Sequence, residues 1–288
     1  MSKKRTVIVL AAFLFIAFLG AFFSEYELRF VPNKPDLRPG ENTPDPKELE
    51  GKFELKGGSE RDNRGFPQRE IVDLVSQFPD LFYRQGPPDE KKVALTFDDG
   101  PDSVYTPQIL DILREHKVKA TFFLIGERVK LFPDVVKRMV KEGHVIGNHT
   151  MTHPNIVKLS NKETVKEIRD CENVIKTLAG YRPALFRSPY GSLDPEKVRE
   201  ISKLKVKIIA WNVDSLDWKS LTAEQVKSNI LENVKEGSII LQHSSGSEEE
   251  NLTGSVAALK DIIKTLKKEG YKFVTVPDLL DIPYKKKV

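Results

Sequence analysis

The sequence contains only one cysteine, Cys171, among its 288 residues. A single thiol cannot form an intramolecular disulfide, so a disulfide-stabilised scaffold is excluded. Cys171 lies within a helical pattern, and we interpret it as a small core residue rather than a nucleophile. No cysteine stands directly after the apolar segment near the N-terminus, which excludes a lipoprotein anchor. The fold must therefore depend on an ordinary hydrophobic core.

The chain between its two terminal clusters also lacks an excess of positive charge. The formal net charge is +4, but six positive side chains lie in two terminal clusters, Lys3–Arg5 and Lys285–Lys287. Without those six the net charge is −2, which excludes the basic surface of a nucleic-acid-binding protein. We interpret the C-terminal lysines as a solvated, frayed tail, with contact to an anionic surface as the alternative.

The N-terminal region predicts a membrane segment. Residues 6–23, directly after Lys3–Arg5, form an uncharged and mostly apolar run of 18 residues. A helix of that length extends roughly 27 Å, close to the hydrocarbon thickness of a bilayer. We expect residues 1–23 to be an uncleaved anchor, with a cleaved signal peptide or a buried core helix as alternatives. The basic cluster predicts a cytoplasmic N-terminus, so the protein would be single-pass with its body outside the cell, or secreted after cleavage.

Two further regions follow the membrane segment. Residues 24–66 combine prolines, glycines and many charges, which predicts an extracytoplasmic linker without a core. Residues 67–288 are expected to form one globular domain that begins with a helix over Arg69–Tyr83.

From Lys92 onward, short β-branched or aromatic runs alternate with longer amphipathic ones. Strands separated by helices are parallel, so the pattern predicts an α/β fold, a distorted or incomplete (β/α) barrel. The predicted strands are Val93–Phe97, Ala120–Ile125, Val145–Ile146, Leu185–Phe186, Lys207–Trp211, Ser238–Gln242 and Lys272–Val276. The predicted helices cover residues 106–116, 133–142, 161–179, 195–203, 222–235 and 252–268.

Ionisable residues follow five of the predicted strands. Active sites of such barrels lie at the C-terminal ends of the strands, so these residues should converge on one rim. In chain order they are Asp98 and Asp99, His149 and His153, Arg187, Asp214 and Asp217 with Trp218 beside them, and His243.

The histidine pair indicates a metal site. His149 and His153 are four residues apart, which places both imidazoles on one side of a helix or regular turn. Two histidines and one carboxylate with open positions are a ligand set for catalytic Zn²⁺ or another divalent metal. No glutamate stands beside His149, so the zinc-peptidase helix motif is absent. Of the carboxylates of Asp98 and Asp99, one can bind the metal while the other acts as a base; a plain Asp-Gly turn is the alternative.

The remaining rim residues suit proton transfer. Arg187 can hold a carboxylate base and favour its charged form, although a surface arginine before a proline turn is the alternative. His243 can act as a general acid if Asp217 keeps it protonated, although a lone histidine after a strand is often structural.

The ordered set of five motifs resembles the NodB-type polysaccharide deacetylases of carbohydrate esterase family four. The resemblance extends from about Lys92 to Leu280. It implies a distorted (β/α) barrel and a divalent metal, with zinc expected and cobalt, nickel or manganese as alternatives. The motifs are Thr96–Gly100, His149–His153, Arg187–Tyr190, Asp214–Trp218 and Leu241–His243.

The resemblance also implies a role for each motif residue. Asp98 would be the general base, and Arg187 would orient it. Asp217 would tune His243, the general acid. Asp99, His149 and His153 would bind the metal; Trp218 and Leu241 would line the acetyl pocket; and the backbone N–H of Tyr190 would stabilise the oxyanion.

This sequence departs from the family pattern after its last motif. Many members have aspartate directly after the last histidine, whereas Ser244 stands here, so no role is assigned to a carboxylate at that place. We interpret the acidic loop 248–250 as shaping substrate access or as merely solvated. Asp99 is present where a branch acting on muramic acid has asparagine, which favours N-acetylglucosamine.

Together these features predict an anchored, monomeric hydrolase that removes N-acetyl groups from N-acetylglucosamine residues of peptidoglycan. Chitin oligosaccharides and O-acetyl xylan are the alternative substrates. A catalytically inactive, anchored glycan-binding protein is the alternative of another class. A phosphate-binding barrel enzyme would require a glycine-rich loop after a late strand, where His243 and the glutamates stand instead.

Overall fold

The structure, a computed structural model, describes residues 73–287. The predicted membrane segment and the predicted linker lie outside the described residues, as does the start of the predicted helix over Arg69–Tyr83. Within residues 73–287 that helix is only α4 (Leu74–Gln77), and Phe82–Tyr83 form strand β1 instead. Pro79 accounts for the early end, because a proline disfavours helical backbone in the residue before it. No helix of the described part is long and apolar enough to cross a membrane.

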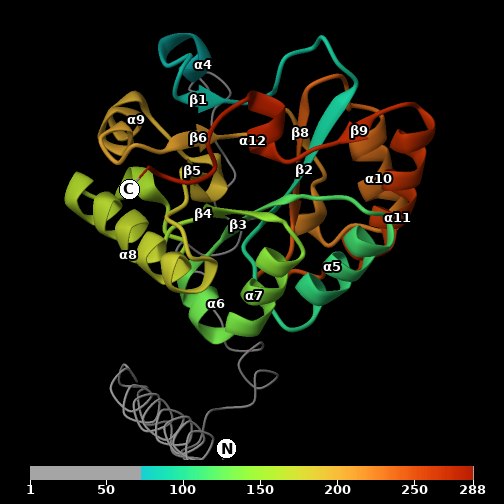
Figure 1. Ribbon diagram of the computed structural model, residues 1–288, viewed down its shortest axis with the longest axis horizontal. Coiled ribbons are helices and arrows are strands. Elements are labelled where there is room, and N and C mark those ends of the chain that lie inside the picture. The colour runs from blue at the N-terminus through green and yellow to red at the C-terminus, as the bar shows by residue number, and fades with distance from the viewer. Residues whose placement is uncertain (1–72, 288) are drawn as a thin grey trace, which may run out of the picture. The chain divides into compact units, whose positions relative to one another are not determined.

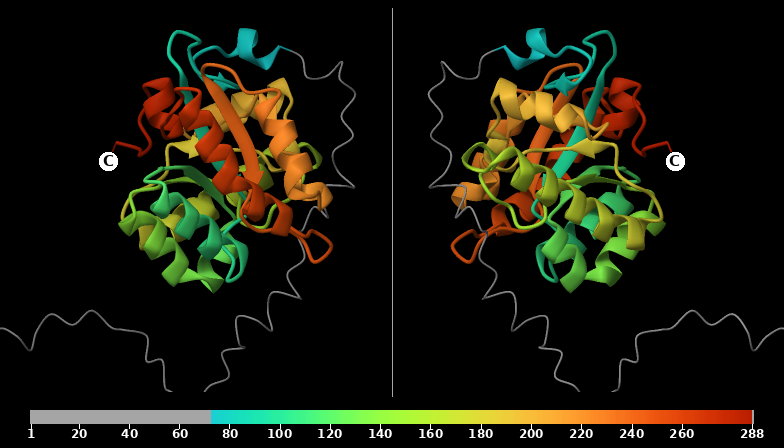
Figure 2. Two further views of the ribbon diagram at one scale, coloured as in Figure 1. Left: turned by 90° about the vertical axis from the view of Figure 1, so that its right-hand side faces the viewer. Right: turned by 90° about the vertical axis from the view of Figure 1, so that its left-hand side faces the viewer.

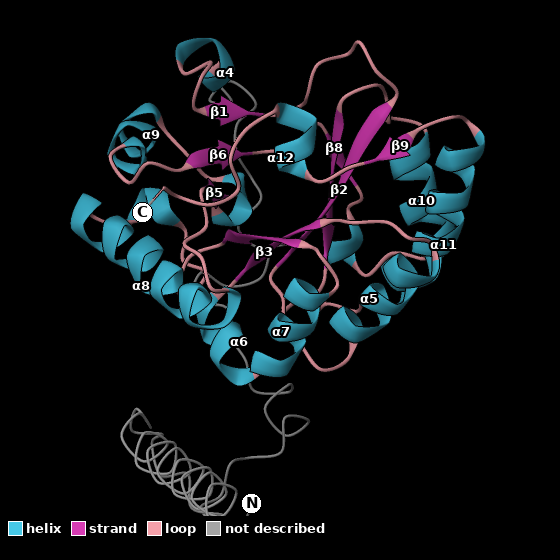
Figure 3. Cartoon of the chain, in the orientation of Figure 1, coloured by secondary structure: helices cyan, strands magenta, loops and turns pink. Residues whose placement is uncertain are grey.

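The described residues form a parallel sheet with helices on its outer side (Figures 1 and 3). The strand order is β1-β6-β5-β4-β3-β2-β8-β7, with β9 also paired to β2. Besides β1, the strands are β2 (Lys92–Asp98), β3 (Thr121–Leu124), β4 (Val145–Asn148), β5 (Leu185–Phe186), β6 (Lys207–Ile209), β7 (Val213–Asp214), β8 (Ser238–His243) and β9 (Lys272–Phe273). All the ladders between these named strands are parallel, as the alternating pattern predicted.

The sheet curls because one segment joins its two sides. The predicted strand Lys207–Trp211 is divided: β6 pairs with β5, and β7 pairs with β8. Residues 210–212 carry the chain between them, so the sheet is a distorted, curled half-barrel rather than a flat layer. The predicted strand Lys272–Val276 is also shorter, because Thr275 caps helix α12 (Val276–Leu280) with its side chain.

Helices cover the outer surface of the curled sheet in all three views (Figures 1 and 2). The best-defined is α8, whose start is fixed by a capping box between Ser160 and Glu163 and whose end is Gly180 in the left-handed conformation. The helices are α5 (Tyr105–Glu115), α6 (Gly126–Leu131), α7 (Pro133–Lys141), α8 (Asn161–Ala179), α9 (Pro195–Ser202), α10 (Ala223–Leu231) and α11 (Thr253–Lys268), with α12. Of these, α6 and α12 were not predicted, and the predicted helix over 222–235 ends at Leu231.

Two sequence interpretations have different outcomes. Cys171 is fully buried in the core, as expected of a small core residue. The C-terminal lysines are not a frayed tail, because Lys286 donates a backbone hydrogen bond to the Arg182 carbonyl and its ammonium pairs with buried Glu172. The charge of Glu172 explains this docking, since a buried carboxylate requires a partner.

Candidate active site

Strands β2 and β8 supply the centre of the site through their register. Asp98 is the Cα partner of His243, and Thr96 is the partner of Leu241. Side chains alternate along a strand, so these residues share the inner face of the sheet. The β2 side chains between them, including Phe97, pack into the outer core under the helices. On the inner face, buried ionisable side chains therefore appear only at the last residues of the two strands, Asp98 and His243.

Arg187 holds Asp98 in a fixed position. One Arg187 Nη1 donates to Asp98 Oδ1 at 2.8 Å and to Thr96 Oγ1 at 2.8 Å. The guanidinium also donates to the carbonyls of Ile209 and Ala210. Arg187 is only 1% exposed, and a buried, multiply hydrogen-bonded guanidinium loses little mobility on pairing with a carboxylate.

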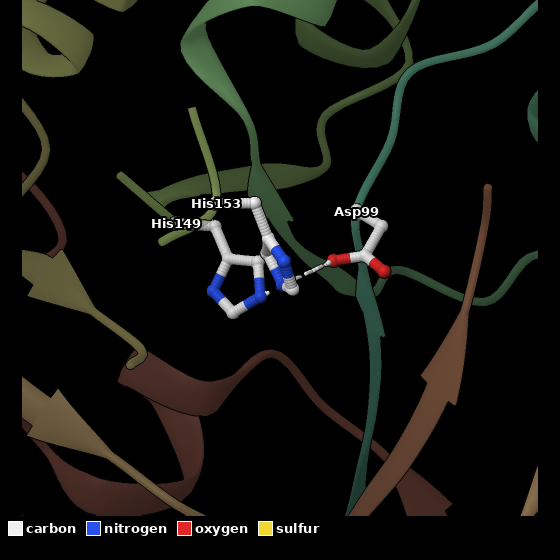
Figure 4. Close-up of side chains that lie close together, drawn as sticks. All are labelled: Asp99, His149 and His153. Atoms are coloured by element: carbon white, nitrogen blue, oxygen red, sulfur yellow. Dashed lines mark ion pairs between the residues drawn. The ribbon is translucent and has the colours of Figure 1, made fainter. Parts of the chain in front are cut away.

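Asp99, His149 and His153 converge (Figure 4), and His149 also lies beside Asp98. The Nε2 atoms of His149 and His153 lie 3.3 and 3.2 Å from Asp99 Oδ1. One ligand atom of each residue lies within 4.8 Å of the others. Asp98 Oδ2 is 3.9 Å from the Nε2 of His149, so the second carboxylate stands at the edge of this group.

The hydrogen bonding of these three residues fits a bound cation. Neither Asp99 oxygen, nor Nε2 of His153, has a hydrogen-bond partner among the described residues, although all three atoms are buried. The outer ring nitrogens are engaged: Nδ1 of His149 lies 2.8 Å from the Arg187 carbonyl, and Nδ1 of His153 lies 3.0 Å from the Tyr190 hydroxyl. Such partners fix the ring orientation of metal-ligating histidines and direct Nε2 inward.

The carboxylates and imidazoles of this group affect one another's pKa values. Burial opposes ionisation of Asp99, but the imidazoles of His153 and His149 hold the pKa of its carboxyl well below the usual value. Burial likewise opposes protonation of His149, yet the carboxylates of Asp98 and Asp99 raise its pKa above the usual value. A cation in this place would take over the role of the histidine protons.

A second histidine–carboxylate contact lies next to the first. His243 Nδ1 is 2.7 Å from Asp217 Oδ1, while Asp217 Oδ2 accepts hydrogen bonds from the His243 backbone N–H and the Ser255 hydroxyl. Burial raises the pKa of Asp217, but His243 and these hydrogen bonds outweigh burial and keep that pKa below the usual value. The carboxylate is therefore charged and directs one ring nitrogen of His243.

The other motif residues occupy different positions. Tyr190 is buried in a left-handed backbone conformation and contacts His153 through its hydroxyl, a contact the sequence did not indicate. Trp218 is buried beside Asp217, with the Lys219 ammonium 4.9 Å from its ring centroid. Leu241 is fully buried, and Asp214, its Cα partner on β7, accepts the Leu216 backbone N–H in a local turn.

Strained backbone is concentrated around the site. Nine non-glycine residues of the described chain have positive φ, and five of them border the site: Asp99, Thr150, His153, Tyr190 and Leu216. Each costs on the order of 1 kcal/mol or more, which a protein retains only where the surroundings impose it.

Sequence reasoning missed several supporting residues. Thr96, named only as the first residue of the first motif, accepts from Arg187, and Ser255 donates to Asp217. The sequence assigned no role to either hydroxyl. Ser244 donates its backbone N–H to the Asp98 carbonyl, and its own carbonyl accepts from Thr106. In the acidic loop, Glu250 is buried and accepts the Ser247 N–H, so it is not simply solvated.

Comparison with known proteins indicates the family of this chain. The polysaccharide deacetylase family model matches residues 85–209. A peptidoglycan-N-acetylglucosamine deacetylase of Bacillus cereus is 46% identical over 202 residues, covering 70% of this chain and 73% of that protein. The peptidoglycan-N-acetylmuramic acid deacetylase PdaC of Bacillus subtilis is 38% identical over 216 residues, covering 75% of this chain and 43% of PdaC.

A solved structure shares the same fold. The crystal structure of a peptidoglycan N-acetylglucosamine deacetylase in complex with 4-naphthalen-1-yl-N-oxidanyl-benzamide matches with a TM-score of 0.71 and 43% identity, over 74% of this chain and 99% of that one. With the relatives' identity and coverage, the chain belongs to the polysaccharide deacetylases of carbohydrate esterase family four, and it is a hydrolase of the carbohydrate N-deacetylase class.

Proposed function

We propose that this protein removes the N-acetyl group from N-acetylglucosamine residues of peptidoglycan in a zinc-dependent reaction. The observation that carries the proposal is the buried Asp99–His149–His153 cluster, with its unsatisfied ligand atoms, directly beside Asp98 and Arg187. That arrangement supports a cation site and a carboxylate base at one point of the rim.

Asp98 is proposed as the base. It would accept a proton from the water that attacks the acetyl carbonyl carbon. Arg187 holds one of its oxygens at 2.8 Å, while the other lies toward His149. This contact fixes the position of the carboxylate, as a base requires.

His243 is proposed as the acid. As the C–N bond breaks, the leaving amine nitrogen needs a proton, which the Nε2 atom of His243 would donate. Asp217 contacts the other ring nitrogen at 2.7 Å, so it orients the ring and favours the imidazolium before transfer. This proposal is supported by the register of β2 and β8, in which Asp98 and His243 are Cα partners on neighbouring strands.

Asp99, His149 and His153 would hold the metal. When bound, a divalent cation supplies a Lewis acid that lowers the pKa of water and polarises the acetyl carbonyl. Two imidazoles and one carboxylate form a donor set that would suit zinc. Tyr190, Trp218 and Leu241 would complete the acetyl pocket, with the Tyr190 N–H as an oxyanion donor.

Relatives support peptidoglycan as the substrate, since the Bacillus cereus protein is named for N-acetylglucosamine in that polymer. PdaC, named for N-acetylmuramic acid, makes that sugar the second candidate. Chitin oligosaccharides and O-acetyl xylan remain alternative substrates of the same chemistry. An inactive glycan-binding role would be favoured by loss of the base or the acid, and both Asp98 and His243 are present.

The location proposed is the outer face of the cell membrane. The apolar run 6–23 behind a basic cluster supports an anchored protein whose catalytic domain is exported. A monomer is proposed as its oligomeric state. An anchor would keep the domain close to the cell wall, where peptidoglycan lies.

The substrate is tested by measuring acetate release from four polymers by the full-length, zinc-loaded protein: peptidoglycan, the same peptidoglycan chemically N-deacetylated, chitin oligomers and acetylated xylan. We expect release from intact peptidoglycan, with glucosamine rather than muramic acid carrying the new free amine when free amines are chemically labelled before acid hydrolysis. New muramic acid amines would transfer the assignment to the second candidate. Acetate from none of the polymers would contradict the enzymatic proposal.

A further inference from the structure

The turn between the two proposed metal-binding histidines has an irregular backbone. Thr150 has φ of 70° and His153 has φ of 58°, both in the left-handed region that non-glycine residues rarely adopt. This conformation brings both imidazoles to Asp99 Oδ1. Since no regular helix or strand imposes it, other parts of the protein must hold the turn.

Helix α6 and the end of β4 hold the first half of the turn. The backbone N–H groups of Gly126 and Glu127 donate to the carbonyls of Thr150 and Met151, each at 3.0 Å. Asn148 Oδ1 accepts the Thr150 N–H at 2.9 Å, and its amide donates to the Ile168 carbonyl in α8. These contacts leave the N–H groups of Met151 and Thr152 to be satisfied elsewhere.

Glu167 of helix α8 satisfies both of those N–H groups. Its Oε2 accepts from the Met151 N–H at 3.0 Å and from the Thr152 N–H at 2.9 Å. Its Oε1 accepts from the Thr152 hydroxyl at 3.0 Å. One carboxylate therefore receives three hydrogen bonds from the centre of the turn, and bonds to an ionised acceptor are stronger than neutral ones.

We propose that Glu167 is a positioning residue that fixes the His149–His153 turn for metal binding. It does not belong to the group of ligand atoms around Asp99, so it acts through the backbone between the two ligands. The inference rests on the proposed metal site. Without Glu167 the turn would lose three hydrogen bonds. Metal binding would then have to order this backbone, which Glu167 holds in place in the wild-type protein, and the affinity for metal would fall.

The test measures the Zn²⁺ affinity of metal-free, full-length protein by competition with a chromogenic chelator. Glu167→Ala should weaken Zn²⁺ binding about 10- to 100-fold, the usual effect of removing a group that orients a metal ligand. Glu167→Gln, which keeps one acceptor oxygen, should fall between that variant and the wild type. At saturating Zn²⁺ both variants should recover turnover, because Asp98 and His243 are unchanged.

Glu172→Gln is the matched control on the same helix. Glu172 is a buried carboxylate, whereas Glu167 is partly buried, and it pairs with Arg182 and Lys286 away from the turn. The control should lower the melting temperature and leave Zn²⁺ affinity within about twofold, since distant sites act independently. Equal weakening by Glu172→Gln, or unchanged affinity in Glu167→Ala, would overturn the inference. If Glu167→Ala does not fold, Glu167→Gln decides by the same comparison. A wild-type protein that binds no Zn²⁺ would instead contradict the proposed function.

Discussion

Two histidine–carboxylate clusters lie on the same rim, and they differ in how their polar atoms are satisfied. In the Asp217–His243 pair, both carboxylate oxygens have hydrogen-bond partners. In the Asp99–His149–His153 cluster, neither oxygen of Asp99 has one among the described residues. Since Asp99 has two imidazoles as ion-pair partners but no hydrogen bond among the described residues, its cluster is suited to a cation. The Asp217–His243 pair is suited to holding a proton.

Removing the carboxylate of the unsatisfied cluster should have the largest effect. Asp99→Ala should lose Zn²⁺ binding, and with it at least about 10³-fold in kcat/KM, because a Lewis acid contributes several kcal/mol to the transition state. Metal content after dialysis and acetate release measure the two effects. Stoichiometric zinc in this variant would show that the cation lies elsewhere.

Changing the neighbouring carboxylate should separate chemistry from metal binding. Asp98→Asn should lower kcat by about 10²- to 10⁴-fold, the usual contribution of a general base, while the protein keeps its zinc. The same dialysis and acetate assays apply. Zinc loss in Asp98→Asn together with zinc retention in Asp99→Ala would reverse the two assignments.

A variant of the satisfied pair should affect only proton transfer. Asp217→Asn should lower kcat by about 10²-fold through loss of the imidazolium partner, with zinc affinity unchanged.

The same variant tests the charge of Asp217 through protein stability. Because the pKa of Asp217 is lowered in the folded protein, its ionisation stabilises the fold above the unfolded pKa near 3.8. This stabilisation is lost as the pH falls through the pKa of the folded protein. Asp217→Asn should therefore flatten the acid limb of a thermal-unfolding profile; an unaltered profile would contradict the charged state.

Proton competition sharpens the contrast further. The raised pKa of His149 means that protons compete with zinc from above pH 6.5 downward. Apparent zinc affinity should fall by about tenfold per pH unit in that range, because the ligand must be deprotonated. Asp98→Asn removes one cause of the raised pKa, so the fall should begin at a lower pH. Affinity independent of pH between 5 and 8 would contradict this account.

A buried histidine outside both clusters should have the smallest effect on activity. His144 accepts the Ala120 N–H, and burial lowers its pKa to about 4. Between pH 6.5 and about 4, the folded state then binds fewer protons than the unfolded state. The free energy of unfolding therefore decreases as the pH is lowered through that window, by up to about 3 kcal/mol. His144→Gln should flatten this loss in urea titrations without changing zinc affinity; a wild-type slope in the variant would argue against it.

The sequence predicted the parallel sheet and the convergence of strand-end residues, because alternating periodicity and strand-end position are local features. It failed where tertiary contacts decide local structure. The segment 207–214 has one strand pattern but divides to pair on two sides of the curled sheet. Glu167 and Ser255 carry no motif, since their roles depend on helices packing against the rim. Lys286 seemed a tail residue because its partner, Glu172, is distant in sequence.

The central claim is that a cation at the Asp99–His149–His153 cluster enables Asp98 and His243 to hydrolyse the acetamide. Its most direct test is to titrate metal-free, full-length protein with Zn²⁺ while measuring the initial rate of acetate release from peptidoglycan. We predict no release at the start, a linear rise and a plateau at one zinc per chain. Full activity without metal, or no activity at one equivalent of bound zinc, would contradict the claim.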